Sequence, residues 1–130
     1  MIDLRAIPNQ TLEQCLASVR RDGMTLEWVD TQTFEICLAA VTQNGLALQF
    51  VEQQTAAICE AAVAQNLEAL LYVYELTPAV CLVAALQDDS AFRYFDLDAL
   101  PECEEKEELK NLHMISILSI KERLYDSGTR

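Results

Sequence analysis

Five cysteines are the residues whose type and spacing first suggest chemistry. They stand 22 residues apart, and the chain has no others: Cys15, Cys37, Cys59, Cys81 and Cys103. Cysteines can form disulfides, bind zinc or act as nucleophiles. Equivalent atoms in stacked helical repeats lie about 9–11 Å apart, because helices pack at 8–10 Å, whereas a disulfide needs Cα atoms closer than about 7 Å. Zinc ligands must converge on one ion. We therefore expect reduced, buried, apolar cysteines and no metal site.

The other chemically active residues form no catalytic pattern. The single histidine, His113, is expected to be a partly exposed structural residue. Asp88 and Asp89, or Asp96 and Asp98, are candidates for acid–base work or Mg²⁺ binding, but such pairs are more typical of helix caps. Cys103 stands among glutamates, which raise the pKa of a thiol and make it a poor nucleophile. The sequence predicts a protein that is not an enzyme and that needs no cofactor.

The elements that would hold these residues are near-copies of one 22-residue unit. The copies begin at Leu4, Leu26, Leu48 and Leu70, and a degenerate fifth begins at Phe92. The copies from Leu26, Leu48 and Leu70 open with Leu-x-aromatic-Val, whereas Ala6 replaces the aromatic in the first copy and the fifth reads Phe92/Tyr94/Phe95. Residues 45–51 predict about two turns of helix. A recurring threonine then predicts the N-cap of a second helix of about ten residues. These threonines are Thr11, Thr33, Thr55 and Thr77.

Local signals agree on these boundaries. Pro78 stands where proline suits a helix start, and Gln14 completes a capping box with Thr11. Asn44 and Gly45 predict a left-handed helix end. One unit has two amphipathic helices and cannot bury both, so stacking is required.

The sequence thus predicts an all-α fold, a short α-solenoid of about four helix-turn-helix repeats in one domain, 1–130. The repeats span 4–96, a C-terminal capping helix or helix pair spans 97–125, and a frayed tail spans 126–130. Apolar residues recur at helical spacing through the predicted cap: Leu109, Leu112, Ile115, Leu118, Ile120 and Leu124. We expect them to cover the apolar face of the last repeat.

The copies resemble a bacterial family of short helical repeats of unknown function. Its units read roughly A-L-x-[YF]-V, a few polar residues, then [IV]-C-x-x-A-V-x-x-[ND]-G. The likeness is carried by Ala47–Val51, Ile58-Cys59, Ala62-Val63 and Asn44-Gly45, and it covers about residues 4–96. The resemblance implies a helical repeat fold and brings no catalytic residues with it.

The charge pattern predicts a partner. The net charge is −12, and no Lys or Arg occurs from Asp22 to Phe92. An ordinary soluble surface intersperses both signs, although a charge run is often only a solvated face. The candidate partner-binding residues are the outward-facing acids Glu27, Asp30, Glu35, Glu52, Glu60, Glu68 and Glu75.

Such a surface repels nucleic acid and anionic lipid and attracts basic proteins. We therefore expect a protein-interaction module for a basic partner. The alternative is a nucleic-acid mimic that inhibits a nucleic-acid-binding protein, as a phage-encoded antagonist of host defence would.

Two further patterns have alternative interpretations. The aromatic stripe Trp28, Phe50, Tyr72 and Tyr94 lacks the positive charge of a base-stacking platform, so we expect it in the core between repeats. Leu16, Leu38 and Leu82 directly follow the core cysteines. Either they form an apolar groove or, as we expect, they pack between repeats.

The sequence also predicts a location. The longest apolar run, Ala79–Leu86, is far short of the roughly 20 residues that span a membrane. The N-terminus lacks a basic patch followed by an apolar run. We expect a cytoplasmic protein, or one in the host-cell cytoplasm if phage-encoded or a secreted effector.

Overall fold

The computed structural model describes residues 4–128, and the side chains of residues 4–122. Within this range the chain consists of α-helices and short 3-10 helices (η) with no strand, so the predicted all-α class is confirmed. By its internal contacts the chain divides into two compact units, Met1–Glu75 and Leu76–Arg130, and each is described by itself. The prediction of one domain over 1–130 stays a prediction.

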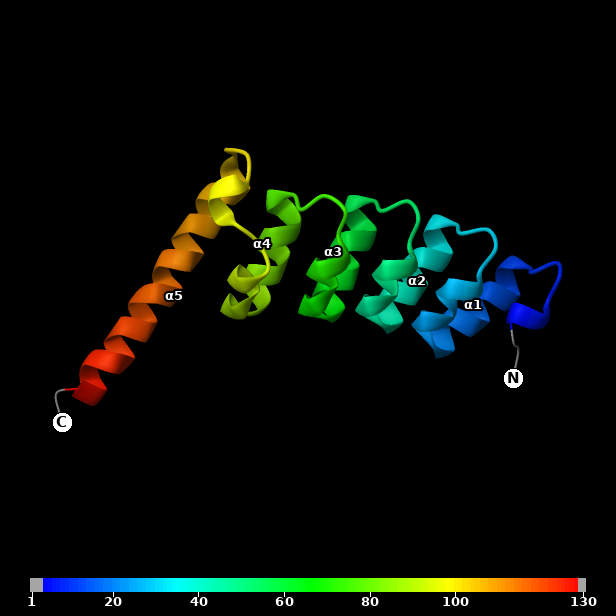
Figure 1. The fold of residues 1–130 in the computed structure, drawn as a ribbon, viewed down its shortest axis with the longest axis horizontal. Coiled ribbons are helices and arrows are strands. Elements are labelled where there is room, and N and C mark those ends of the chain that lie inside the picture. The colour runs from blue at the N-terminus through cyan, green and yellow to red at the C-terminus, as the bar shows by residue number, and fades with distance from the viewer. Residues whose placement is uncertain (1–3, 129–130) are drawn as a thin grey trace. The chain divides into compact units, whose positions relative to one another are not determined.

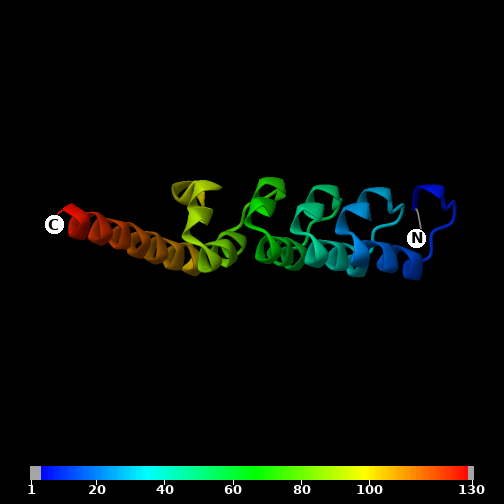
Figure 2. The same cartoon turned by 90° about the horizontal axis from the view of Figure 1, so that it is seen from below.

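The first unit alternates 3-10 and α-helices. Its elements are η1 (Leu4–Ala6), α1 (Leu12–Arg21), η2 (Gly23–Trp28), α2 (Phe34–Gln43), η3 (Gly45–Phe50), α3 (Ala56–Gln65) and η4 (Leu67–Tyr72). In Figures 1 and 2, α1, α2 and α3 lie side by side in one layer, and η2, η3 and η4 form a second layer. The buried side chains of both layers form one core, which includes Leu26, Ile36, Val41, Leu48, Ile58 and Val63.

The α-helices begin at the predicted threonines. The hydroxyl oxygen of Thr33 accepts a hydrogen bond from the backbone N–H of Ile36 at 3.2 Å, and Thr55 serves Ile58 in the same way. Thr11 and Gln14 form the predicted capping box. Each α-helix of this unit is ten residues long, as expected.

The helix ends differ from the prediction. Asn44 is extended, with φ −148° and ψ 110°, and no residue in the described part of the chain has a positive φ. The Asn44 side chain instead accepts the backbone N–H of Leu46 at 3.0 Å and so begins η3. Gly45 is needed for space, because a Cβ there would overlap the carbonyl oxygen of Ala62 on α3. Gly23 meets the carbonyl oxygen of Ala40 in the same way.

A glutamine in each of the first three copies joins that copy to the next. The Gln32 amide donates to the carbonyl of Phe50 at 2.6 Å and accepts from the backbone N–H of Glu52 at 2.9 Å. Its oxygen also accepts from the Cys37 thiol at 3.5 Å. The same three contacts recur at Gln10 and Gln54, and we call these three residues the bridging glutamines.

The prediction that the aromatic stripe lies in the core was wrong for Trp28 and Tyr72. Trp28 is 38% exposed and Tyr72 is 37% exposed, whereas Phe50 and Tyr94 are each partly buried. A 3-10 helix has three residues per turn, so Leu26 and Val29 share the buried side of η2 while Trp28 faces outward. The Arg5 guanidinium carbon lies 4.8 Å from the centre of the Trp28 ring.

The second unit contains α4 (Pro78–Gln87), η5 (Asp89–Arg93), η6 (Leu97–Ala99) and α5 (Glu104–Gly128). Pro78 opens α4, as predicted. The core of the second unit consists of Cys81, Ala85, Leu100 and Leu109. Six partly buried side chains pack against it: Leu76, Leu82, Phe92, Phe95, Leu97 and Leu112. The C-terminal segment is therefore one long helix whose first half packs on α4, within the range of the predicted cap.

Three apolar residues of α5 from Ile115 onward do not cover this core. Ile115 is 59% exposed, Leu118 is 50% exposed and Ile120 is 46% exposed, which contradicts their predicted packing. The reason is that α5 is longer than α4, the helix that it packs against. At about 1.5 Å per residue a 25-residue helix runs about 37 Å, whereas the ten residues of α4 run about 15 Å. The Leu124 side chain lies outside the described residues.

The predicted tail 126–130 is helical as far as Gly128, and residues 129–130 lie outside the described range. Among the described residues no helix is both long enough and apolar enough to cross a membrane.

Candidate functional site

The seven predicted acids all belong to the first unit but not to one row. Six are exposed, and Glu60 is partly buried. Glu27 and Glu68 lie on η2 and η4, Glu35 and Glu60 lie on α2 and α3, and Asp30, Glu52 and Glu75 lie in the loops that lead from η-helices to α-helices. Only Asp30 and Glu52 occupy equivalent positions of the 22-residue unit.

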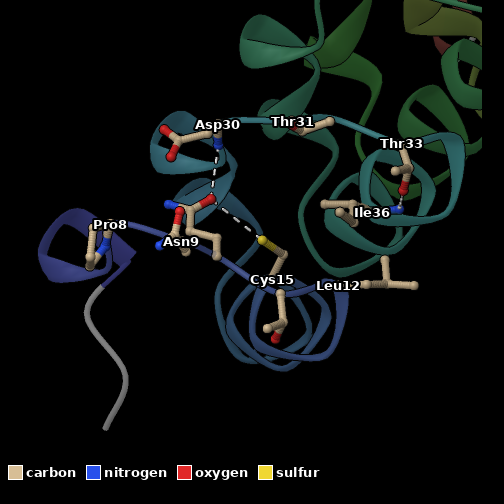
Figure 3. A pocket seen from close by; sticks show the side chains of 10 residues that line it. Pro8, Asn9, Leu12, Cys15, Asp30, Thr31, Thr33 and Ile36 are labelled. Carbon is tan, nitrogen blue, oxygen red and sulfur yellow. Dashed lines mark hydrogen bonds between the residues drawn. The ribbon is translucent and has the colours of Figure 1, made fainter.

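Asp30 stands at a pocket of about 410 Å³, the Asp30 pocket. Its lining comes from the loop before α1, the first turn of α1, the loop before α2 and the first turn of α2. The residues are Pro8, Asn9, Gln10, Thr11, Leu12, Cys15, Asp30, Thr31, Thr33 and Ile36. The side-chain oxygen of Gln10 accepts hydrogen bonds from the Asp30 backbone N–H at 2.9 Å and from the Cys15 thiol at 3.5 Å. Figure 3 marks both contacts with dashed lines that start at Asp30 and Cys15. The Asp30 carboxylate takes part in neither contact.

An equivalent pocket lies one 22-residue copy further along the chain. The Glu52 pocket, of about 180 Å³, is lined by Gln32, Thr33, Phe34, Cys37, Glu52, Gln53, Thr55 and Ile58. Each of these residues follows a residue of the Asp30 pocket by 22 positions. The second pocket is smaller because bulkier side chains stand at three equivalent places: Phe34 for Leu12, Glu52 for Asp30 and Gln53 for Thr31.

The bridging glutamines fix this geometry. Gln10 accepts the backbone N–H of Asp30, and Gln32 accepts that of Glu52. The backbone that carries each carboxylate is therefore held in place. The cap hydroxyl of Thr33 and the glutamine amides are already hydrogen-bonded within the protein. No described side chain pairs with the carboxylate of Asp30 or Glu52.

The thiols are poor reactive groups. Burial raises the pKa of the Cys15 thiol, and the charge of Asp30 adds to this. Burial and then the charge of Glu52 raise the pKa of Cys37. Both thiols are therefore protonated and neutral near pH 7, and each hydrogen-bonds to its glutamine. All five cysteines are free, and the four at 15, 37, 59 and 81 are buried as predicted.

One of the seven acids lies beside neither pocket but at another hollow, of about 490 Å³. Glu35 lines it together with Arg20, Leu38, Ala39, Thr42 and Gln43. Of the leucines that follow the cysteines, Leu38 lines this hollow, Leu16 is buried, and Leu82 packs in the second unit. Leu16 and Leu82 therefore serve packing, as expected.

The candidate acid–base residues Asp88, Asp89 and Asp96 make structural contacts. The Asp88 carboxylate accepts the backbone N–H of Ser90 at 2.9 Å, which lowers its pKa, and Asp96 accepts that of Asp98 at 3.0 Å. Both aspartates are therefore helix caps, as the sequence favoured. Asp89 accepts the Ser116 hydroxyl at 2.7 Å. His113 is partly exposed and packs on Phe92, with ring centres 4.6 Å apart, as predicted. Among the described residues no three His, Cys, Asp or Glu side chains are placed to hold a metal ion.

Sequence reasoning missed the bridging glutamines and the pocket walls. The signal was present, because glutamine stands at positions 10, 32 and 54, one period apart. At the fourth position of the series stands Leu76, which packs against the apolar core of the second unit instead.

Comparison of this chain with protein-family models, with curated proteins and with solved structures finds no match. The resemblance to a family of short helical repeats therefore stays a prediction.

Proposed function

We propose that each 22-residue copy is one unit of a short α-solenoid of about four units, closed by α5 as a C-terminal cap. Three observations support this. The α-helices of the first unit pack consecutively, its η-helices do the same, and the bridging contacts recur at the first three copies. Repeats that contact only their neighbours are what a solenoid requires.

We propose further that the chain is a non-enzymatic protein-interaction module whose acidic surface binds a basic partner. One observation carries this proposal: two equivalent pockets each present a carboxylate, of Asp30 or Glu52, that pairs with no described side chain, and both acids belong to the stretch from Asp22 to Phe92, which has no Lys or Arg. Uniform negative charge speeds the approach of a basic partner, and ion pairs then fix its register. The apolar pocket walls, such as Leu12 and Phe34, add contact area.

The alternative hypothesis is that the acids only keep the surface hydrated. Their charges would then be interchangeable, and the surface would bind no particular partner. The test compares two immobilised proteins: the wild type, and a variant with all seven acids replaced by Asn or Gln. Circular dichroism first checks that both are equally helical. Cell extract is passed over each, bound proteins are eluted with rising salt, and mass spectrometry identifies them.

We expect a small set of basic proteins on the wild type, released at moderate salt and absent from the neutralised variant. If both proteins retain the same set, the acidic surface is not the binding surface. If a retained partner binds nucleic acid, competition with DNA or RNA decides between simple binding and the inhibitory mimic.

A further inference from the structure

The Asp30 and Glu52 pockets repeat with the spacing of the helices that hold them. They lie at the N-terminal ends of α1 to α3, and α1, α2 and α3 pack side by side. Packed helices are separated by about 8–10 Å. Two successive side chains of one partner segment must therefore lie about 8–10 Å apart to enter both pockets.

This spacing selects a backbone conformation. In a β-strand, side chains on one face are about 6.6 Å apart at every second residue and about 13 Å apart at every fourth, so neither matches. A polyproline II helix has three residues per turn and rises about 3.1 Å per residue. Its side chains therefore return to the same face about every 9.3 Å, which agrees with the pocket spacing.

The pocket chemistry selects a cationic side chain. Each pocket has an exposed apolar side chain, Leu12 or Phe34, and one carboxylate that pairs with no described side chain. Lysine and arginine bury an aliphatic stem against apolar surface and keep the charged end in water. The positive ends of the α-helices oppose a cation with only about half a unit charge each, which the full charge of a carboxylate exceeds.

We infer that the Asp30 and Glu52 pockets together bind a polyproline II segment of a partner protein with lysine or arginine at every third residue. This inference rests on the proposed function, because it names the partner segment that the acidic surface recognises. The two carboxylates set the register, and the polyproline II form suits the site because it costs little ordering on binding.

The test uses two labelled peptides of equal composition. One is Lys-Pro-Pro repeated four times, and the other has four adjacent lysines followed by eight prolines. Fluorescence anisotropy at low salt measures the affinity of each for three proteins. These are the wild type, the pocket variant Asp30→Asn/Glu52→Gln, and the control variant Glu60→Gln/Glu68→Gln, which removes the same charge outside both pockets.

We expect the spaced peptide to bind the wild type more tightly than the block peptide. Each exposed ion pair changes affinity about two- to fivefold, so the pocket variant should lose about tenfold for the spaced peptide. The control variant should lose clearly less and keep the preference.

Equal affinity for both peptides, with equal losses in both variants, would overturn the inferred register and leave the proposed binding of basic partners intact. No binding of either peptide by the wild type, even at low salt, would overturn both.

Discussion

Removal of one bridging glutamine tests the physical account of the fold most sharply. In the variant Gln32→Ala, the carbonyl of Phe50 and the backbone N–H of Glu52 lose their partner, as does the Cys37 thiol. Each backbone hydrogen bond contributes about 1 kcal/mol net. Gln32 is only partly buried, so water can replace part of the loss. We therefore expect the free energy of unfolding to fall by about 2 kcal/mol.

Urea titration measures this loss. Trp28 is the only tryptophan, and it lies in η2 close to Gln32, so its fluorescence reports on the first unit. With a urea slope of about 1 kcal/mol per molar, the transition midpoint should fall by about 2 M. The matched control is Gln53→Ala, an exposed neighbour, which should change the free energy by less than about 0.5 kcal/mol.

A second variant separates hydrogen bonding from bulk. Gln32→Leu keeps the side-chain volume and loses the three hydrogen bonds, so it should destabilise about as much as Gln32→Ala. If the leucine restores stability, or if Gln32→Ala behaves like Gln53→Ala, the bridging contacts do not hold the units together and the reasoning is refuted.

Three further predictions follow from packing and burial. Gly45→Ala should destabilise by about 2 kcal/mol in the same titration, because the added Cβ overlaps a carbonyl oxygen on α3; a gain in stability would show that the close approach is absent. Leu109→Ala should cost about 2–5 kcal/mol by circular dichroism, since Leu109 is fully buried, whereas Leu118→Ala should cost less than about 0.5 kcal/mol; equal costs would contradict the packing of α5. Burial raises the pKa of the Cys81 thiol to about 11, so the folded protein holds this proton more tightly than the unfolded chain does. This contribution is complete below about pH 8.5 and is lost as the pH rises towards 11, so unfolding free energy should fall by about 2 kcal/mol more in the wild type than in Cys81→Ala; parallel pH profiles would refute it.

Local signals predicted most of the helices because each acts over a few residues. The threonine caps, Pro78 and the ten-residue helices need only their own neighbours in sequence. Gly45 was misinterpreted because its reason lies 17 residues away, at the carbonyl of Ala62. A glycine that makes room for another helix and a glycine that turns left-handed are the same letter in the sequence.

The exposed positions were harder to predict than the buried ones. Aromatic residues at a fixed period suggested a core, but the three-residue turn of the η-helices places Trp28 outside. Ile115 and Leu118 had the spacing of a packed face, but α5 extends beyond the helix that it packs against. Hydrophobic spacing shows which residues share a face and does not show whether another element reaches it.

The candidate site was predicted only in part. Charge counting selected seven acids, and Asp30 and Glu52 were among them, but nothing in the charge pattern separated these two from the others. What sets them apart is the pocket beside each, which forms from loops and helix turns about 20 residues apart. Comparing the copies position by position would have shown that only these two acids are equivalent.

The most direct test of the central claim is a titration of the ¹⁵N-labelled protein with the peptide Lys-Pro-Pro repeated four times, followed by NMR. The account predicts that the backbone signals of Asp30, Thr31, Glu52 and Gln53 shift together and saturate at one affinity. Shifts confined to η4 or α5, or no shifts at low salt, would contradict the claim that the paired pockets bind a basic segment.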